Sequence, residues 1–129
     1  MKFIQTQKAP SAIGPYSQAT VVNGMVYTSG QIALLSNGSD ELLSADVVTQ
    51  TRQVLNNLRE VLEAADSSLE SVIKTTIFIA DMDDFTAINE IYESFFKDHK
   101  PSRSTVAVKT LPKNALVEID AVALTQNRR

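Results

Sequence analysis

The chain contains no cysteine, and its 129 residues include a single histidine. Without cysteine, disulfide bonds, thiolate metal sites and a thiol nucleophile are excluded on chemical grounds. No run of about eighteen apolar residues is present, so the sequence predicts no membrane-spanning helix. The start of the chain also lacks the apolar core of a signal peptide. Any chemistry therefore has to use oxygen and nitrogen groups, and the expected localisation is cytoplasmic.

An excess of positive charge is absent too. Twelve Lys and Arg residues against fifteen Asp and Glu residues give a net charge of -3. Because neutralised phosphates supply most of the non-specific affinity for nucleic acid, this charge balance disfavours a nucleic-acid partner. The hydrophobic fraction of 43% and the charged fraction of 21% are ordinary for a globular protein. The length predicts one domain over residues 1–129.

The first half of the chain predicts a hairpin followed by a helix. Asn-Gly at 23–24 lies between β-rich runs, which predicts a tight hairpin over residues 21–28 because both residues tolerate positive φ. Apolar residues then recur at helical spacing over residues 45–65. We expect an amphipathic helix there, with Ser44 or Asp46 as its N-cap.

The second half alternates strands with one more helix. That helix is expected to begin at Asp83 or Asp84 and to end before Pro101. β-branched residues dominate three further segments, each too short for a comfortable helix. Strands are therefore predicted over residues 71–80, 102–108 and 116–124.

This order of elements indicates an α+β fold with one mixed β-sheet and two helices on one face. On the strand at 71–80 both alternating sets are apolar, so both faces of the strand are expected to be buried. The two sets are Ile73, Ile77 and Ile79, and Val72, Phe78 and Ala80. Two helices cover only one face of the sheet, so the other face of the sheet is expected to pack against sister subunits. The alternative is an irregular segment of the same chain folded over that face.

Two acids on the last predicted strand are the first candidates for chemistry. Glu118 and Asp120 lie two residues apart and therefore project from one face of the strand. A carboxylate that is withdrawn from water must be paired or neutral, and such groups often transfer protons. A sheet margin that faces solvent is an equally good explanation of the spacing.

Arg103 is the second candidate, because it opens the preceding strand on the same face as Thr105. A guanidinium there can pair with one of the acids or bind a planar carboxylate through two parallel hydrogen bonds. If Arg103 and Glu118 line one cavity, they supply an anion clamp and a proton carrier. The alternative is a surface ion pair.

Weaker signals come from turns and from an acidic cluster. Gly14-Pro15 sets a turn that can aim Tyr16, and Ser29-Gly30 ends a strand, although both can be plain turn signals. The acidic cluster lacks the pattern of a calcium loop, and helix capping explains it better, so we expect no metal. It consists of Asp81, Asp83 and Asp84.

Six segments together carry a family resemblance that spans essentially the whole chain. They are AIGPYSQA at 12–19, YTSGQI at 27–32, VIKTTIF at 72–78, PSRST at 101–105, LPK at 111–113 and VEI at 117–119. In order and spacing they resemble the reactive intermediate deaminase (Rid) family, also called YjgF or L-PSP endoribonuclease-like. Each segment alone is a weak signal, whereas the block from Arg103 to Glu118 combined with the early Gly-Pro-Tyr is specific.

The resemblance implies a chorismate-mutase-like fold and a homotrimer with a central β-barrel, outer helices and three clefts between subunits. It implies hydrolysis of enamines or imines, such as 2-iminobutanoate and 2-iminopropanoate, to 2-oxoacids and ammonia without a cofactor. Arg103 and Glu118 are the implied catalytic residues. The implied substrate-binding residues are Tyr16, Ser29, Gly30, Asn89, Arg103 and Thr105.

One departure from the family pattern is Thr105, which stands where many members have cysteine. A thiol-dependent role is therefore absent here, although hydrolysis itself needs no sulfur and the main-chain groups remain. Two other functions stay open. One is an endoribonuclease or translation inhibitor, and the other is a non-catalytic metabolite-binding or chaperone-like trimer.

Overall fold

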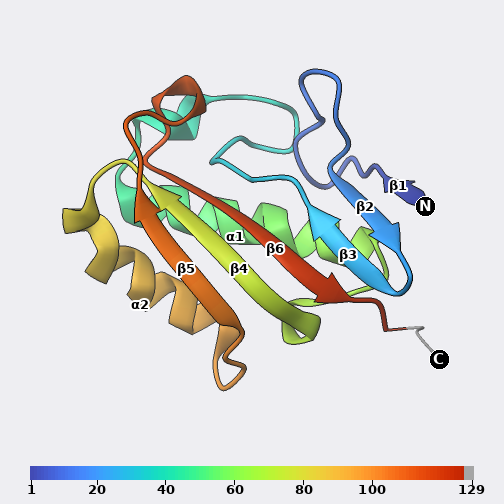
Figure 1. Cartoon of the computed structure of the whole chain (residues 1–129). Helices are drawn as coiled ribbons and strands as arrows, with labels where there is room; N and C mark the ends of the chain where they lie inside the picture. The colour runs from blue at the N-terminus through green and yellow to red at the C-terminus, as the bar shows by residue number, and fades with distance from the viewer. Residues whose placement is uncertain (127–129) are drawn as a thin grey trace.

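The computed structural model describes residues 1–126, which form one mixed six-stranded sheet with two α-helices on one face (Figure 1). The strands are β1 (Lys2–Ile4), β2 (Ala19–Val22), β3 (Met25–Thr28), β4 (Val72–Ile79), β5 (Ser102–Ala107) and β6 (Val117–Leu124). The helices are α1 (Val47–Ala64) and α2 (Phe85–Phe96). The strand order is β1-β2-β3-β6-β4-β5, and only β4 and β5 run parallel. The predicted α+β class with both helices on one face is confirmed.

The hairpin of β2 and β3 forms where Asn-Gly predicts it. Asn23 and Gly24 have φ values of 51° and 76°, which is the left-handed pair that a two-residue hairpin turn requires. The short edge strand β1 was not predicted, because its three residues are too few to show an alternating pattern. It pairs with β2 and places the N-terminal segment beside the hairpin.

Helix α1 buries one stripe against the sheet. Its N-cap is Asp46, whose side chain accepts a hydrogen bond from the main-chain N–H of Thr49 at 2.8 Å. Helix α2 begins at Phe85, slightly later than predicted, because residues 82–84 form a 3-10 turn that Asp81 caps. The core lies between these helices and the sheet. Its largest fully buried apolar side chains are Leu55, Leu58, Leu62, Ile77, Ile79, Ile88 and Ile119.

Strand β4 corrects one expectation. A β-bulge between Val72 and Lys74 shifts the alternation, so Val72 lies on the helix-covered face with Ile77 while Ile73 is 42% exposed. The prediction that Ile73 shares a face with Ile77 and Ile79 is wrong for this reason. The outer face of β4 carries Lys74, Thr76 and Phe78, which is a mixed surface rather than an apolar one.

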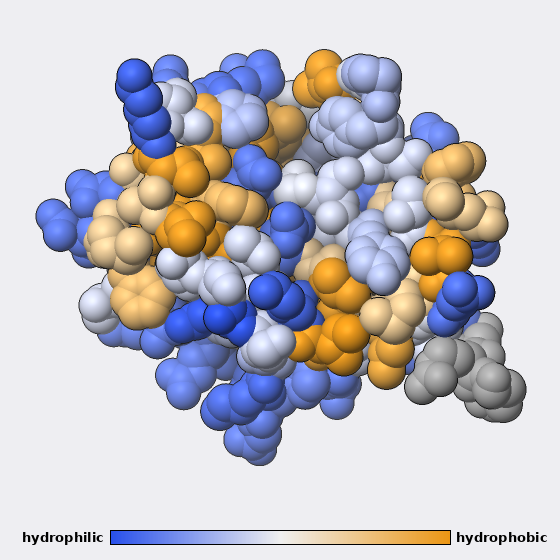
Figure 2. Space-filling model, viewed as in Figure 1, coloured by the Kyte–Doolittle hydropathy of each residue, from blue (hydrophilic) through white to orange (hydrophobic). Residues whose placement is uncertain are grey.

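The sheet face that lies away from the helices is uncovered in the single chain (Figure 1). Figure 2 shows apolar patches over this face, separated by polar side chains. Tyr27 and Val106, which point to this side, are 45% and 42% exposed. Neither helix within residues 1–126 combines the length and the apolar character needed to cross a bilayer.

Candidate functional site

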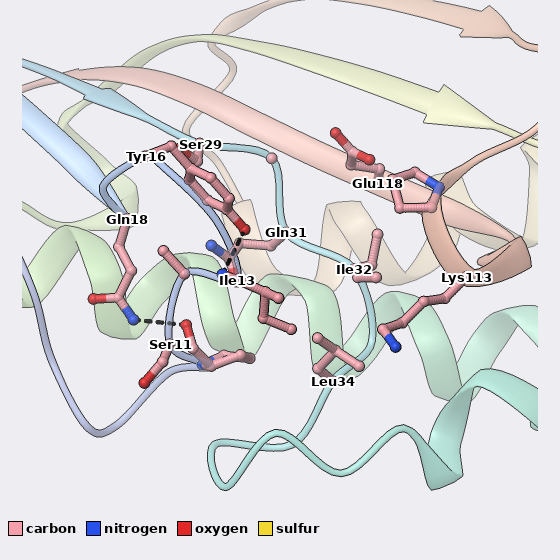
Figure 3. Close-up of a pocket in the computed structure, with 14 residues that line it drawn as sticks. Ser11, Ile13, Tyr16, Gln18, Ser29, Gln31, Ile32, Leu34, Lys113 and Glu118 are labelled. Atoms are coloured by element: carbon pink, nitrogen blue, oxygen red, sulfur yellow. Dashed lines mark hydrogen bonds between the residues drawn. The ribbon is translucent and has the colours of Figure 1, made fainter.

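Four of the predicted site residues gather around a cavity of about 460 Å³, which we call the Glu118 cavity (Figure 3). Its walls come from residues 10–18 and 29–34, from the turn at 112–113 and from Glu118. The predicted residues among them are Tyr16, Ser29, Gly30 and Glu118. The volume lies within the range of about 300–1,000 Å³ that is usual for small-molecule sites.

The N-terminal wall of this cavity is held by main-chain contacts. Gln18, which is 3% exposed, donates its side-chain amide to the carbonyls of Thr6 and Pro10 and accepts from the N–H of Thr6. Ser29 donates its hydroxyl to the carbonyl of Ser17 at 2.6 Å. Residues distant in sequence are therefore fixed beside the end of β3, and the Ser29 hydroxyl is already engaged as a donor.

Glu118 lies directly against the main chain of Gly30. A β-carbon placed on Gly30 would come within 2.7 Å of the carboxyl carbon of Glu118, closer than real β-carbons approach other atoms. The approach is set by a pair of hydrogen bonds between Gln31 and Ile119, with N–O distances of 2.9 and 3.1 Å. A side chain at position 30 would therefore push the flexible carboxyl end of Glu118 out of its present position.

The environment of Glu118 favours its protonated form. Burial raises the pKa of the Glu118 carboxyl above its ordinary value, and the neighbouring Asp120 carboxylate raises it further. Burial also raises the pKa of Asp120, while a hydrogen bond from Thr76 and the charge of Lys74 act in the opposite direction. The predicted pair of acids shares one face of β6, and a carboxyl whose pKa is raised by burial is suited to proton transfer.

Arg103 and Asn89 form a second group between β5 and α2. An Nη1–H of Arg103 donates to Oδ1 of Asn89 at 2.8 Å. The guanidinium carbon lies 4.9 Å from the ring centroid of Tyr92 and 5.5 Å from that of Phe85, so two aromatic faces also hold it. Arg103 and Asn89 line a cavity of about 400 Å³, which we call the Arg103 cavity. Lys97, Lys100 and Arg103 line it together with one acid, Glu93, so the balance of charge suits an anion.

Arg103 and Glu118 point to opposite faces of the sheet. Arg103 is paired with Thr75, whose hydroxyl bonds Tyr92 of α2 at 2.8 Å, so Arg103 is on the helix side. Glu118 is paired with Phe78 on the uncovered side. The expectation that Arg103 and Glu118 line one cavity is therefore not met within a single chain, and strand spacing alone could not reveal this.

Thr105 lies on β5 on the same face as Arg103, and it lines neither of the two cavities. Among the described residues its Oγ1 is buried without a hydrogen-bond partner. Across residues 1–126, no three His, Asp or Glu side chains come together in a group that would hold a metal ion. Lys113 lines the Glu118 cavity but was not among the predicted site residues, because only its LPK motif was visible in the sequence.

Comparison with known proteins gives matches over nearly the whole chain. The family model described as Endoribonuclease L-PSP matches residues 6–125. The 2-iminobutanoate/2-iminopropanoate deaminase of Homo sapiens is 45% identical over 95% of this chain and 89% of its own length. The structure of E. coli TdcF with bound serine has a TM-score of 0.90 at 44% identity, covering 98% of this chain and 100% of TdcF. The crystal structure of the E. coli YjgF gene product has a TM-score of 0.89 at 42% identity, covering 96% of this chain and 98% of the YjgF chain.

Proposed function

Because the chain belongs to the reactive intermediate deaminase family, we propose that it hydrolyses small imines and enamines of amino acids to 2-oxoacids and ammonia. The proposed substrates include 2-iminobutanoate and 2-iminopropanoate, the compounds in the name of the human relative. The single observation that carries the proposal is the Glu118 carboxyl, which lies in a small cavity against the main chain of Gly30 with a raised pKa. Bound serine in the TdcF structure also supports a site for a small carboxylic acid.

The proposed assembly is a homotrimer in which each cleft joins the Arg103 cavity of one subunit to the Glu118 cavity of its neighbour. The opposite orientations of Arg103 and Glu118 support it, because one chain alone cannot bring the two groups together. The uncovered sheet face, with Tyr27 and Val106 exposed on it, supports burial against another copy. Three such clefts follow from threefold symmetry.

In this mechanism Arg103 binds the substrate carboxylate. A guanidinium can form two parallel hydrogen bonds with a planar carboxylate, which fixes both position and orientation. Asn89 holds the guanidinium from one side and Tyr92 supports it from its ring face, so little side-chain freedom is lost when the substrate binds. Thr105, on the same strand, contributes its main-chain groups.

Glu118 exchanges the protons of the hydrolysis. The protonated carboxyl donates to the imine nitrogen, water adds to the carbon of the C=N bond, and the resulting carboxylate accepts a proton from that water. The carbinolamine then collapses to the 2-oxoacid and ammonia. Tyr16 and Asn89 shape and polarise the cleft. Because these imines already hydrolyse in water, positioning together with acid-base catalysis of about a hundred- to ten-thousand-fold is sufficient without a cofactor.

The test couples the purified protein to a pyridoxal-dependent threonine dehydratase and times the release of 2-oxobutanoate. We expect wild type to accelerate the release and Arg103→Ala to lose most of that acceleration. Arg52→Ala removes an exposed arginine of α1 and serves as the matched control, which should behave as wild type. Equal acceleration by wild type and Arg103→Ala would exclude the assigned role of Arg103.

Glu118→Gln distinguishes an enzyme from a metabolite-binding protein. If the chain is a catalyst, this variant should retain binding of 2-oxobutanoate while turnover is lost. Endoribonuclease activity is a second candidate, because the matching family model carries that description. It predicts RNA binding that weakens steeply with salt together with Arg103-dependent cleavage, whereas the net charge of -3 disfavours it.

A further inference from the structure

The Glu118 cavity contains one basic side chain to which the proposed mechanism gives no role. Of the residues among 1–126 that line this cavity, Lys113 alone carries a cationic group. Figure 3 shows its side chain extending along the cavity from the turn after Pro112 toward Leu34, with Ile32 beside it. The ammonium group therefore lies at the part of the cavity wall that Leu34 forms.

The backbone holds Lys113 in this place at a conformational cost. Lys113 has φ 55° and ψ 25°, and Asn114 follows with φ 57°, so two successive residues adopt the left-handed conformation. A lysine rarely adopts this conformation, and residues strained in this way concentrate at functional sites. Here the turn is anchored at both ends by the buried side chains of Leu111 and Ala115.

A contact with helix α1 fixes the turn further. The N–H of Leu116 donates to Oε1 of Gln50 at 3.0 Å, and Gln50 is fully buried. The amide of Gln50 in turn donates to the carbonyls of Leu43 and Ala45. Because the turn is tied to the core at Leu116, the fold sets where the Lys113 backbone lies relative to Glu118.

Apart from Lys113 and Glu118, the described residues that line the cavity are neutral. Ile13, Ile32 and Leu34 supply apolar surface, and Glu118 supplies the only acid among the lining residues described. Lys113 is exposed to solvent at the mouth of this cavity, so its ammonium group can meet an anion that enters from the open side. The cavity volume of about 460 Å³ leaves room for a substrate side chain that ends near this group.

We propose that Lys113 is a specificity-determining residue that favours imines whose side chain carries a second carboxylate, such as the imine of aspartate. This inference rests on the proposed deaminase function. Arg103 from the neighbouring subunit binds the carboxylate next to the imine carbon, and Lys113 binds the carboxylate at the far end. Preference for a dicarboxylic imine over its neutral four-carbon counterpart is the expected consequence.

The test compares 2-iminosuccinate with 2-iminobutanoate, which have four carbons each and are produced in situ by flavin-dependent amino-acid oxidases from aspartate and 2-aminobutyrate. In Lys113→Asn the charge is lost, while asparagine tolerates the left-handed backbone. We expect kcat/KM for 2-iminosuccinate to fall by about tenfold or more, while the value for 2-iminobutanoate changes by less than about twofold. Lys113→Arg should keep the preference. Lys109→Asn changes an exposed lysine outside both cavities and should match wild type.

A binding measurement separates this inference from the proposed function. Fresh oxaloacetate and 2-oxobutanoate are titrated into wild type and Lys113→Asn in a calorimeter, and oxaloacetate should lose affinity selectively. If wild type hydrolyses neither imine but shows this selective loss, deamination is wrong and the role of Lys113 stands. The role of Lys113 would be overturned if Lys113→Asn kept the wild-type ratio of kcat/KM between the two imines and the wild-type ratio of affinity between the two 2-oxoacids. An equal loss for the two imines and for the two 2-oxoacids would leave these ratios unchanged and would overturn it too, even if hydrolysis is confirmed.

Discussion

The main chain of Gly30 leaves no room for a side chain because the Glu118 carboxyl carbon lies 2.7 Å from where its β-carbon would be. In Gly30→Ala the flexible carboxyl end of Glu118 has to move. We therefore expect kcat for imine hydrolysis to fall by about tenfold or more, while the free energy of unfolding changes by less than about 1 kcal/mol. Steady-state kinetics and urea denaturation check both values.

Gly38→Ala is the matched control for this change. Gly38 has φ 90° and has no atom within 4 Å of its β-carbon position, so alanine strains the backbone without touching the Glu118 cavity. It should lower the free energy of unfolding by about 1 kcal/mol or more and leave kcat unchanged. Wild-type kcat in Gly30→Ala would show that the position of the Glu118 carboxyl does not matter for turnover.

Two inactive variants are expected to restore activity when they share a trimer. Arg103→Ala keeps a working Glu118 cavity, and Glu118→Gln keeps a working Arg103 cavity. When equal amounts are unfolded and refolded together, about a quarter of the clefts should combine both intact groups. Specific activity should then approach about a quarter of the wild-type value. If Arg103 and Glu118 act within one chain, the mixture will be as inactive as its components.

Removing the side-chain oxygen of Asn89, which accepts from Arg103, should raise KM more than it lowers kcat. Its Oδ1 lies 2.8 Å from Nη1 of Arg103, and hydrogen bonds to charged groups contribute about 1.5–3 kcal/mol. We expect Asn89→Ala to raise KM about tenfold with little change in kcat, because the guanidinium loses its orientation but remains present. Glu90→Ala alters the exposed neighbour on α2 and should leave both constants unchanged. A fall in kcat alone would assign Asn89 to the chemical step instead.

The raised pKa values of Glu118 and Asp120 predict how stability depends on pH. Because both shifts are upward, the folded chain favours the protonated carboxyls. Their contribution to the free energy of unfolding is fully present below the ordinary carboxyl pKa and is lost as pH rises through the raised folded value. Wild type should therefore lose more stability than Glu118→Gln/Asp120→Asn as the pH rises above the ordinary carboxyl value of about 4.

Urea denaturation at a series of pH values measures this difference. Hydrogen bonds with Thr49 lower the pKa of Asp46. Because Asp46 is present in both proteins, its contribution to the pH dependence of stability cancels from the comparison. Parallel curves for wild type and the double variant would mean that the two carboxyls have ordinary pKa values in the folded protein.

Local patterns in the sequence were enough to predict most of the elements. The left-handed tolerance of Asn23 and Gly24 predicts the hairpin, and helical spacing predicts α1. Of the two predicted N-caps, Ser44 and Asp46, the structure uses Asp46. The two-residue period of a strand places Glu118 and Asp120 on one face of β6 without knowledge of any partner. Each of these features depends on residues within a few positions of one another, and this is why the sequence alone reveals them.

The relation between strands was decided only by the tertiary structure. The bulge between Val72 and Lys74 reverses the alternation of β4, and no local pattern announces it. Pairing then turns Arg103 toward α2 and Glu118 toward the uncovered face. Along a regular strand such as β6 the sequence determined which residues share a face, because that follows from the backbone of one segment. Which face of the sheet each set meets depends on register between segments far apart in the chain, and only folding sets that register.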